Sequence, residues 1–231
     1  MATFMEKLAG FGKKLGWCVV DAFKKLPFAF YCLIHPFQGF YELKNDPRRK
    51  SVNTAILLYI LLAVSAVLRK LMLGYLFVDS VYEQLNVNIL IEVATAVLPY
   101  LLWTIANWCF TSLMDGDGKF VDIFVATAVA LIPLIITNFI SIPLSHYLSL
   151  DSSATFTTIS TLGYVLAYIE IFFGMITIHQ YSVSKGLVTA ILSVLGILII
   201  AFLMVLIYYL CQQVVGFVSQ IYEEIAFRLN E

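Results

Sequence analysis

The sequence predicts an all-α polytopic membrane protein with five transmembrane helices, and three observations support this fold class. Of the 231 residues, 61% are hydrophobic and only 13% are charged, and the mean hydropathy is +0.91. A soluble domain of this size carries roughly a quarter charged residues, so the excess apolar surface is expected to face lipid. The third observation is that long apolar stretches alternate with short polar breaks.

Each apolar stretch has the length of a membrane-spanning helix, because about 20 apolar residues are needed to cross some 30 Å of hydrocarbon. The five stretches are Val52–Val78, Ile89–Leu113, Val121–Leu144, Ile159–His179 and Leu187–Cys211. The expected breaks are Asn86–Asn88, Asp115–Lys119, Ser149–Ser153 and Ser182–Lys185. Proline tends to kink a helix, and Pro99, Pro133 and Pro143 fall inside or at the ends of these spans. Residues 51–211 are therefore expected to form one membrane domain.

The distribution of lysine and arginine predicts the orientation, because these residues collect in cytoplasmic segments. The first fifty residues contain nine of them: Lys7, Lys13, Lys14, Lys24, Lys25, Lys44, Arg48, Arg49 and Lys50. Lys119 and Lys185 fall in the second and fourth breaks, so a cytoplasmic N-terminus places all eleven on one side. Five spans then place the C-terminus outside the cell, in a multi-pass plasma-membrane protein.

Residues 1–50 are expected to form a cytoplasmic amphipathic or interfacial region. An apolar stripe recurs every three or four residues, with the lysines mostly off it: Phe4, Leu8, Phe11, Leu15, Val19, Phe23 and Leu26. Such a helix lies in the membrane interface with its basic residues toward anionic lipid headgroups, or packs as a soluble helix on the rest of the protein. Pro27 should end or kink it. Residues 28–40 are short, apolar and interrupted at His35-Pro36, which favours a second interfacial or re-entrant piece over a sixth span.

Residues 212–231 are expected to form an external amphipathic helix. Val214, Val218, Ile221, Ile225 and Leu229 make an apolar stripe opposite Glu223, Glu224 and Arg228. The tail either continues the fifth helix or folds back onto the outer surface. Its stripe needs an apolar cover, which lipid, the protein itself or a partner subunit would supply. Ile221, Ile225, Glu223 and Arg228 are therefore the candidate interface residues.

Glu170 is the most informative single residue, because a carboxylate near the middle of a span is costly unless it is protonated or paired. Gly163, Ala167, Glu170 and Gly174 are spaced by four, three and four residues and share one helix face. Small residues let another helix approach closely, so this face is a candidate for helix packing or for a partner. Glu170 is then a neutral or hydrogen-bonded packing residue, or part of a proton or ion path. Partners at its depth are Tyr100, Trp103 and Thr104.

Charges near the outer ends of the first two spans can meet at similar depth, because these helices run antiparallel. Glu92 lies a turn inside the second span, and Arg69 and Lys70 lie near the end of the first. An ion pair would lower the desolvation cost of both partners. The alternative is that each side chain snorkels to the interface independently.

No residue pattern predicts an enzyme, a cofactor or a metal site. The four cysteines and three histidines are scattered, with no CxxC and no ligand cluster. The sequence from Asp115 to Gly118 resembles part of a calcium loop, but it lacks the twelve-residue ligand spacing and runs directly into a span. The EExxxR pattern starting at Glu223 is followed by only three residues, so the histidines of a membrane metalloprotease are missing.

The middle of the chain resembles the Yip family of Rab-interacting integral membrane proteins, and its bacterial branch is the most similar. The resemblance covers roughly residues 30–210. It rests on His35–Tyr41, Leu102–Cys109, Asp115–Phe120, Ala130–Pro133 and Gly174–Ser182. The N-terminal DLxGP-type motif of the eukaryotic branch is absent, which argues against Rab and Golgi roles.

The resemblance implies a non-enzymatic membrane protein that binds other membrane proteins or shapes bilayers. Bacterial members of this type are companions of carbohydrate ABC importers, so ABC permease subunits are the implied partners, together with membrane lipids and without nucleic acid. Trp103, Asn107 and Trp108 would then be helix-packing residues, and the turn at 115–120 a partner contact. We therefore expect a scaffold or accessory subunit of a carbohydrate ABC transporter complex. The alternative is a small transporter or channel with Glu170 in its path.

Overall fold

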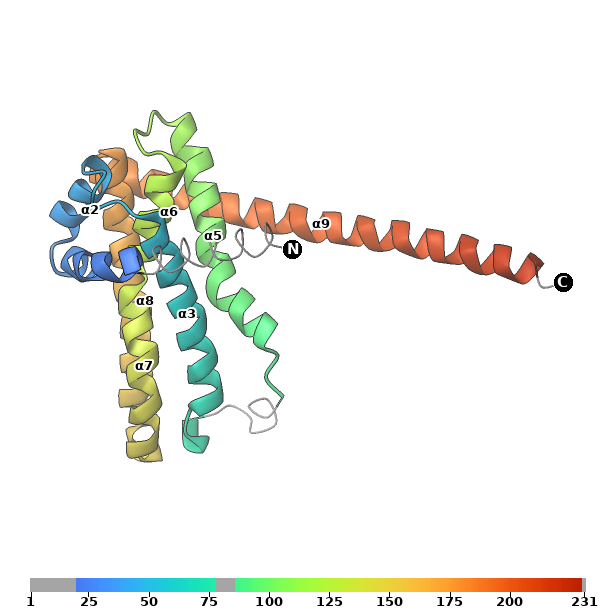
Figure 1. Ribbon diagram of the computed structural model, residues 1–231, viewed down its shortest axis with the longest axis horizontal. Coiled ribbons are helices and arrows are strands. Elements are labelled where there is room, and N and C mark those ends of the chain that lie inside the picture. Colours follow the sequence, from blue (N-terminus) through green and yellow to red (C-terminus); the bar gives the residue numbers. More distant parts are fainter. Residues whose placement is uncertain (1–19, 78–85, 230–231) are drawn as a thin grey trace, which may run out of the picture.

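The computed structural model describes residues 20–77 and 86–229, and these residues form helices joined by short turns, without a strand (Figure 1). Five of the helices are long and apolar enough to cross a membrane. They cover Val52–Met72, Ile89–Leu113, Phe120–Tyr147, Ser153–His179 and Val183–Ile225. The predicted all-α fold class with five such helices is therefore confirmed.

The ends of these helices are set by local polar residues. Helix α3 (Val52–Met72) begins where the Ser51 hydroxyl accepts a hydrogen bond from the Thr54 N–H at 3.3 Å. Helix α5 (Ile89–Leu113) begins at Asn88, whose side-chain oxygen accepts from Leu90 and Ile91 N–H. Such caps satisfy amide groups that have no partner within the first turn. The first span is shorter than predicted, since α3 ends at Met72 and a 3₁₀ turn, η1 (Tyr75–Phe77), follows.

The third span consists of two helices rather than one. Helix α6 (Phe120–Ala130) and helix α7 (Ile132–Tyr147) meet at Leu131, where the backbone has φ −85° and ψ −2°. Pro133 lies at the start of α7, where its missing N–H costs no helical hydrogen bond. Proline therefore breaks this span, whereas Pro99 lies within α5 and Pro143 within α7.

Helices α3, α5, α7 and α8 (Ser153–His179) run alongside one another and form a packed body (Figure 1). The α6–α7 span is its most enclosed element, since 72% of the residues in its apolar 18-residue segment are buried. The core includes Leu58 and Leu62 of α3, Leu131 at the α6–α7 junction and Ile178 of α8. A short 3₁₀ turn, η2 (Leu150–Ser152), joins α7 to α8.

Two helices ahead of α3 form a corner against one end of this body. Residues 20–34 are helical, the chain turns at His35, and α2 (Pro36–Asn45) follows. The helices are in such close contact that a Cβ at Gly39 would lie 2.7 Å from the Cα of Cys32. Helix 20–34 runs through Pro27, so of the expected end or kink at Pro27 the end is wrong, and the chain turns at His35-Pro36 instead. Residues 28–40 are therefore divided between two helices. The predicted stripe from Phe4 to Val19 lies outside the described residues.

The last helix, α9, is one continuous element from Val183 to Leu229. Its 47 residues make it about 70 Å long, more than twice the thickness of the hydrocarbon layer. The predicted continuation of the fifth helix into the tail is observed, in place of a tail folded back. Figure 1 shows that only the start of α9 lies against the body, and the rest extends away to one side.

Candidate functional site

The turn between α5 and α6 is held in place by Tyr181, which lies between α8 and α9. The Tyr181 hydroxyl donates a hydrogen bond to the Met114 carbonyl oxygen at 3.1 Å. Asp115 has a φ of 54°, a left-handed backbone conformation that residues other than glycine rarely adopt. Burial, together with the nearby Asp115 and Asp117 carboxylates, raises the pKa of Tyr181 above its ordinary value, so this hydroxyl remains a donor. The turn is therefore a fixed part of the fold.

His179 completes the attachment of the same turn. Its Nδ1 accepts a hydrogen bond from the Gly118 N–H at 3.3 Å, and its ring stacks on Tyr181 with centroids 5.3 Å apart. A Cβ at Gly116 or Gly118 would lie within 2.6 Å of the His179 ring. The two glycines that suggested a calcium loop are thus required for close contact with His179. A neutral His179 that accepts at Nδ1 carries its proton on Nε2.

Ion pairs surround this turn and connect it to the N-terminal helices. Lys44 of α2 lies 3.9 Å from the Asp117 carboxylate, and Lys50 forms an ion pair with the buried Asp122 of α6. Asp122 also accepts from the Lys119 N–H at 3.0 Å, which caps α6. In the described part of the chain, no three histidine, cysteine or acidic side chains gather as metal ligands. The ion pairs therefore join the segment around Lys44 and Lys50 to the 115–119 turn and to α6.

Asn107 is the polar contact between the body and α9. Its Nδ2 donates to the Ser193 hydroxyl at 3.2 Å, and both side chains are fully buried. Asn107 and His179 also line a small internal cavity of about 10 Å³, next to the partly buried Trp103. The Asn107 Oδ1 and His179 Nε2 atoms have no hydrogen-bond partner among the described residues. Trp108, by contrast, is 42% exposed and contacts the Phe120 ring edge-on at 5.8 Å.

The small-residue face of α8 is covered within the chain. Gly163, Ala167, Glu170 and Gly174 are all buried. A Cβ at Gly163 would overlap the Thr137 side chain of α7, and one at Gly174 would lie 3.3 Å from the Phe40 ring of α2. This face therefore lets α7 and α2 approach α8.

Glu170 shares this covered face, and its carboxylate lies close enough to Cys32 to affect the thiol. Burial raises the pKa of Cys32 to about 12, and the Glu170 and Glu42 carboxylates add to the shift. Among the described residues, Glu170 forms no hydrogen bond or ion pair with Tyr100, Trp103 or Thr104. Its role in packing, or in a path through the membrane, remains a prediction.

Arg69, Lys70 and Glu92 line one cavity of about 640 Å³, at the end of the body away from the 115–119 turn. The three charged side chains therefore lie at the same end of the body, as the antiparallel course of the two spans predicts. No ion pair within 4.0 Å joins Arg69 to Glu92 in the described residues; Arg69 donates instead to the Asn138 side-chain oxygen at 3.2 Å. Asn138 in turn donates to the Ser65 hydroxyl at 3.1 Å, which joins α3 to α7.

The candidate interface residues of the tail lie on the exposed part of α9. Ile221 and Ile225 are exposed, and so is Glu223, whereas the Arg228 side chain lies outside the described positions. Every described side chain from Phe202 to Ile225 is exposed. No other described part of the chain has an apolar surface of this length uncovered.

Sequence reasoning missed Asn138 and Ser193, which make hydrogen bonds between helices inside the body. A signal was available, since asparagine is rare in an apolar span and tends to bond across helices when it occurs there. Sequence reasoning also did not anticipate that Tyr181 and His179 would hold the 115–119 turn. These contacts join residues more than sixty positions apart, and no local pattern specifies such a pairing.

These features define a polytopic α-helical membrane protein whose polar clusters join helices. Comparison with known families identifies its group: the model of the Yip1 domain matches residues 30–207. The match covers more than half of the chain, so the chain belongs to the Yip1 domain family, a family of non-catalytic membrane proteins. No curated protein and no solved structure matches the chain significantly.

Proposed function

We propose that this protein is a non-enzymatic membrane scaffold or accessory subunit that binds another integral membrane protein along the outer part of α9. One observation carries the proposal: α9 from Phe202 to Ile225 is apolar around most of its circumference, yet no described part of the chain covers it. A helix whose surface is mostly apolar requires lipid or other helices as neighbours. Soluble partners would leave much of this surface in water.

The two faces of this segment differ in a way that favours one side for the partner. Gln212, Gly216, Ser219 and Glu223 follow one another at offsets of four, three and four and form a small and polar face. On the opposite side lie the larger aliphatic residues Val214, Val218, Ile221 and Ile225. Transmembrane helices associate through small and polar faces, because backbones approach closely and hydrogen bonds form there. We assign the small face to the partner helix and the aliphatic face to lipid.

The partner class that we propose is the permease subunits of a carbohydrate ABC importer. This step rests on the resemblance to the bacterial Yip branch and on no contact within the chain. It is compatible with α9, since permease subunits are helical bundles whose outer helices offer a membrane-embedded surface.

The proposal is tested by purifying the full chain from native membranes in mild detergent and identifying the proteins that accompany it by mass spectrometry. We expect another integral membrane protein to co-purify in stoichiometric amounts. The double variant Gly216→Leu with Ser219→Leu should lower its recovery by about tenfold, because two bulky side chains separate the helices on the small face.

The matched control is Ile221→Ser with Ile225→Ser, on the opposite face of the same helix. Recovery of the partner should persist in this variant. If recovery is lost only in the control pair, the partner lies on the aliphatic face and our assignment is wrong. If the full chain is monodisperse and alone under several gentle conditions, the scaffold function itself is rejected.

A further inference from the structure

The cavity lined by Arg69, Lys70 and Glu92 places three charged side chains around an open space between helices, where close packing would leave none. Its volume is about 640 Å³, and it lies among the end of α3, the start of α5, the middle of α7 and the first half of α8. Figure 1 shows that α5 diverges from α3 toward this end of the body. The cavity lies at the ends of spans, where we expect the headgroup layer of one membrane leaflet.

The basic side of the cavity comes from α3. Arg69 is oriented by its hydrogen bond to Asn138, and Asn138 is fixed by Ser65, so the guanidinium lies on the cavity wall in a defined position. Lys70 follows it in the sequence and lines the same cavity. Arginine and lysine bind phosphate oxygens through charge-assisted hydrogen bonds, and basic pockets between transmembrane helices bind phospholipid headgroups.

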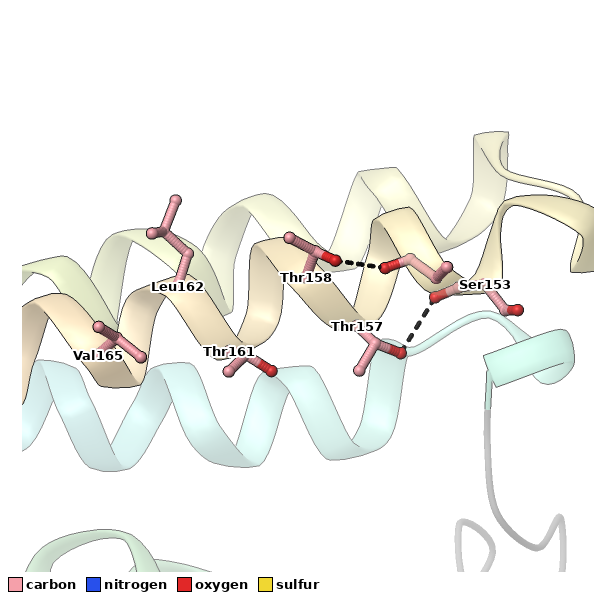
Figure 2. A pocket seen from close by; sticks show the side chains of 7 residues that line it. Ser153, Thr157, Thr158, Thr161, Leu162 and Val165 are labelled. Carbon is pink, nitrogen blue, oxygen red and sulfur yellow. Dashed lines mark hydrogen bonds between the residues drawn. The ribbon is translucent and has the colours of Figure 1, made fainter.

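The opposite side of the cavity presents hydrogen-bond acceptors. Glu92 of α5 supplies a carboxylate. The Thr95 hydroxyl donates its proton to the Ile91 carbonyl at 3.0 Å, and the Thr157 hydroxyl donates to the Ser153 carbonyl at 3.0 Å. Because each hydroxyl proton is engaged within its own helix, the threonine oxygens are left as acceptors. Figure 2 shows Thr157 and Thr161 on one side of α8, away from Leu162, and both threonines line this cavity.

Two cations on one wall and three acceptors on the others match a zwitterion that carries a phosphate and a primary ammonium. A primary ammonium has three N–H donors for Glu92, Thr95 and Thr157, whereas the quaternary ammonium of choline has none. The apolar side chains of Leu73, Phe77 and Phe156 also line the cavity and suit the glycerol and first acyl carbons of a lipid. This apolar part favours a lipid over a free solute.

We propose that this cavity binds the phosphoethanolamine headgroup of a phospholipid. Arg69 and Lys70 hold the phosphate, and Glu92 with the threonine oxygens holds the ammonium. The proposal is independent of the partner on α9, because the cavity and the exposed part of α9 share no residue.

The test uses the full chain in phosphatidylcholine nanodiscs in which about one lipid in five to ten is phosphatidylethanolamine or phosphatidylglycerol. Native mass spectrometry then measures which lipids the protein retains. We expect phosphatidylethanolamine to be retained on the order of tenfold above its bulk share. Arg69→Gln with Lys70→Gln should lower retention of both test lipids by about tenfold. Glu92→Gln should lower only the preference for ethanolamine over glycerol headgroups.

Two controls keep the result decisive. Lys185→Gln removes a charge outside the cavity and should leave lipid retention unchanged, while Arg69→Lys keeps the charge and should preserve most of the binding. Soluble glycerophosphoethanolamine, added in excess, should not displace the lipid. If it competes as well as the lipid does, the site serves a solute and the lipid assignment is overturned. Equal retention of phosphatidylcholine and phosphatidylethanolamine, or retention indifferent to Glu92 and Arg69, would overturn the proposal as a whole.

Discussion

The α6–α7 span and helix α9 are both strongly apolar, but the first is buried within the protein and the second is exposed. The most apolar window of α6–α7 is 72% buried within the protein, whereas that of α9 is only 11% buried, although α9 is the more apolar of the two. Hydropathy therefore identifies segments that leave water, but it does not identify the segments that pack on one another. In a membrane, lipid covers an apolar surface as well as a neighbouring helix does.

Polar and small residues account for the difference. Helix α7 carries Asn138, Ser141 and Ser145, and all three are buried at contacts with other helices. In α9 the buried small and polar residues are Gly186, Thr189, Ser193 and Gly196, all near its start. The small and polar residues farther along, such as Gln212, Gly216 and Ser219, are exposed. Helix packing within the chain thus uses small and polar side chains, and those on the outer part of α9 have no described helix against them.

The largest expected difference between the two regions is in cysteine reactivity. Cys32 is fully buried with a thiol pKa of about 12, and Cys211 on α9 is exposed. The thiolate is the reactive form, and a raised pKa keeps the thiol protonated at neutral pH. In single-cysteine variants at pH 8, we expect a maleimide to modify Cys211 roughly a thousandfold faster than Cys32. Mass spectrometry of quenched samples measures both rates. Equal rates in the native protein would show that the corner of helix 20–34 and α2 opens readily; equal rates in SDS are the control.

Enlarging a glycine should destabilise the packed body and leave α9 unaffected. A Cβ at Gly163 would overlap the Thr137 side chain, while Gly216 has no atom within 4 Å of the same position. We expect Gly163→Leu to lower the free energy of unfolding by about 2–3 kcal/mol, because α7 and α8 must separate. Gly216→Leu should change it by less than about 0.5 kcal/mol. Thermal unfolding followed by fluorescence size-exclusion compares the two. A similar loss in both variants would contradict the separation into two regions.

The junction between the two regions should be moderately sensitive. Asn107→Ala removes the hydrogen bond to Ser193 and is expected to cost about 1 kcal/mol, a value typical of hydrogen bonds between membrane helices. Gln212→Ala is the comparison, since Gln212 bonds only to Tyr208 of the same helix at 2.6 Å among the described residues. The same thermal assay should detect the first change and not the second. No effect of Asn107→Ala would mean that α9 is attached by its apolar contacts alone.

The smallest expected effect is that of removing residues 212–231. No described side chain from Phe202 to Ile225 is buried, so the body loses nothing on which its packing depends. We expect the melting temperature of the body to stay within about 2 °C of the full chain, equivalent to roughly 0.5 kcal/mol. A large decrease would show that the tail folds onto the body in solution. Partner recovery, measured separately, should be lost in this truncated chain.

The sequence by itself determined that the spans lie in hydrocarbon, the fold class, and some of the span boundaries; α8 and α9 begin several residues before the predicted spans, and α9 continues well beyond Cys211. Ile89–Leu113 was predicted with both ends correct, because Asn88 is a cap and Met114 begins a polar turn. The family was also readable from short segments such as Asp115–Phe120. Local signals suffice for these features, since caps, apolar length and motif residues act within a few positions.

Only the tertiary structure decided which faces are occupied. It placed the glycines of the 115–119 turn, for which the sequence already argued against a calcium loop, in contact with His179, and it covered the α8 face of Gly163 with α7. It also brought Arg69 and Glu92 to one cavity without pairing them among the described residues, and it left the outer part of α9 uncovered. Such outcomes depend on contacts between residues far apart in the chain. The length and hydropathy of an apolar helix do not specify which other helix it will pack against.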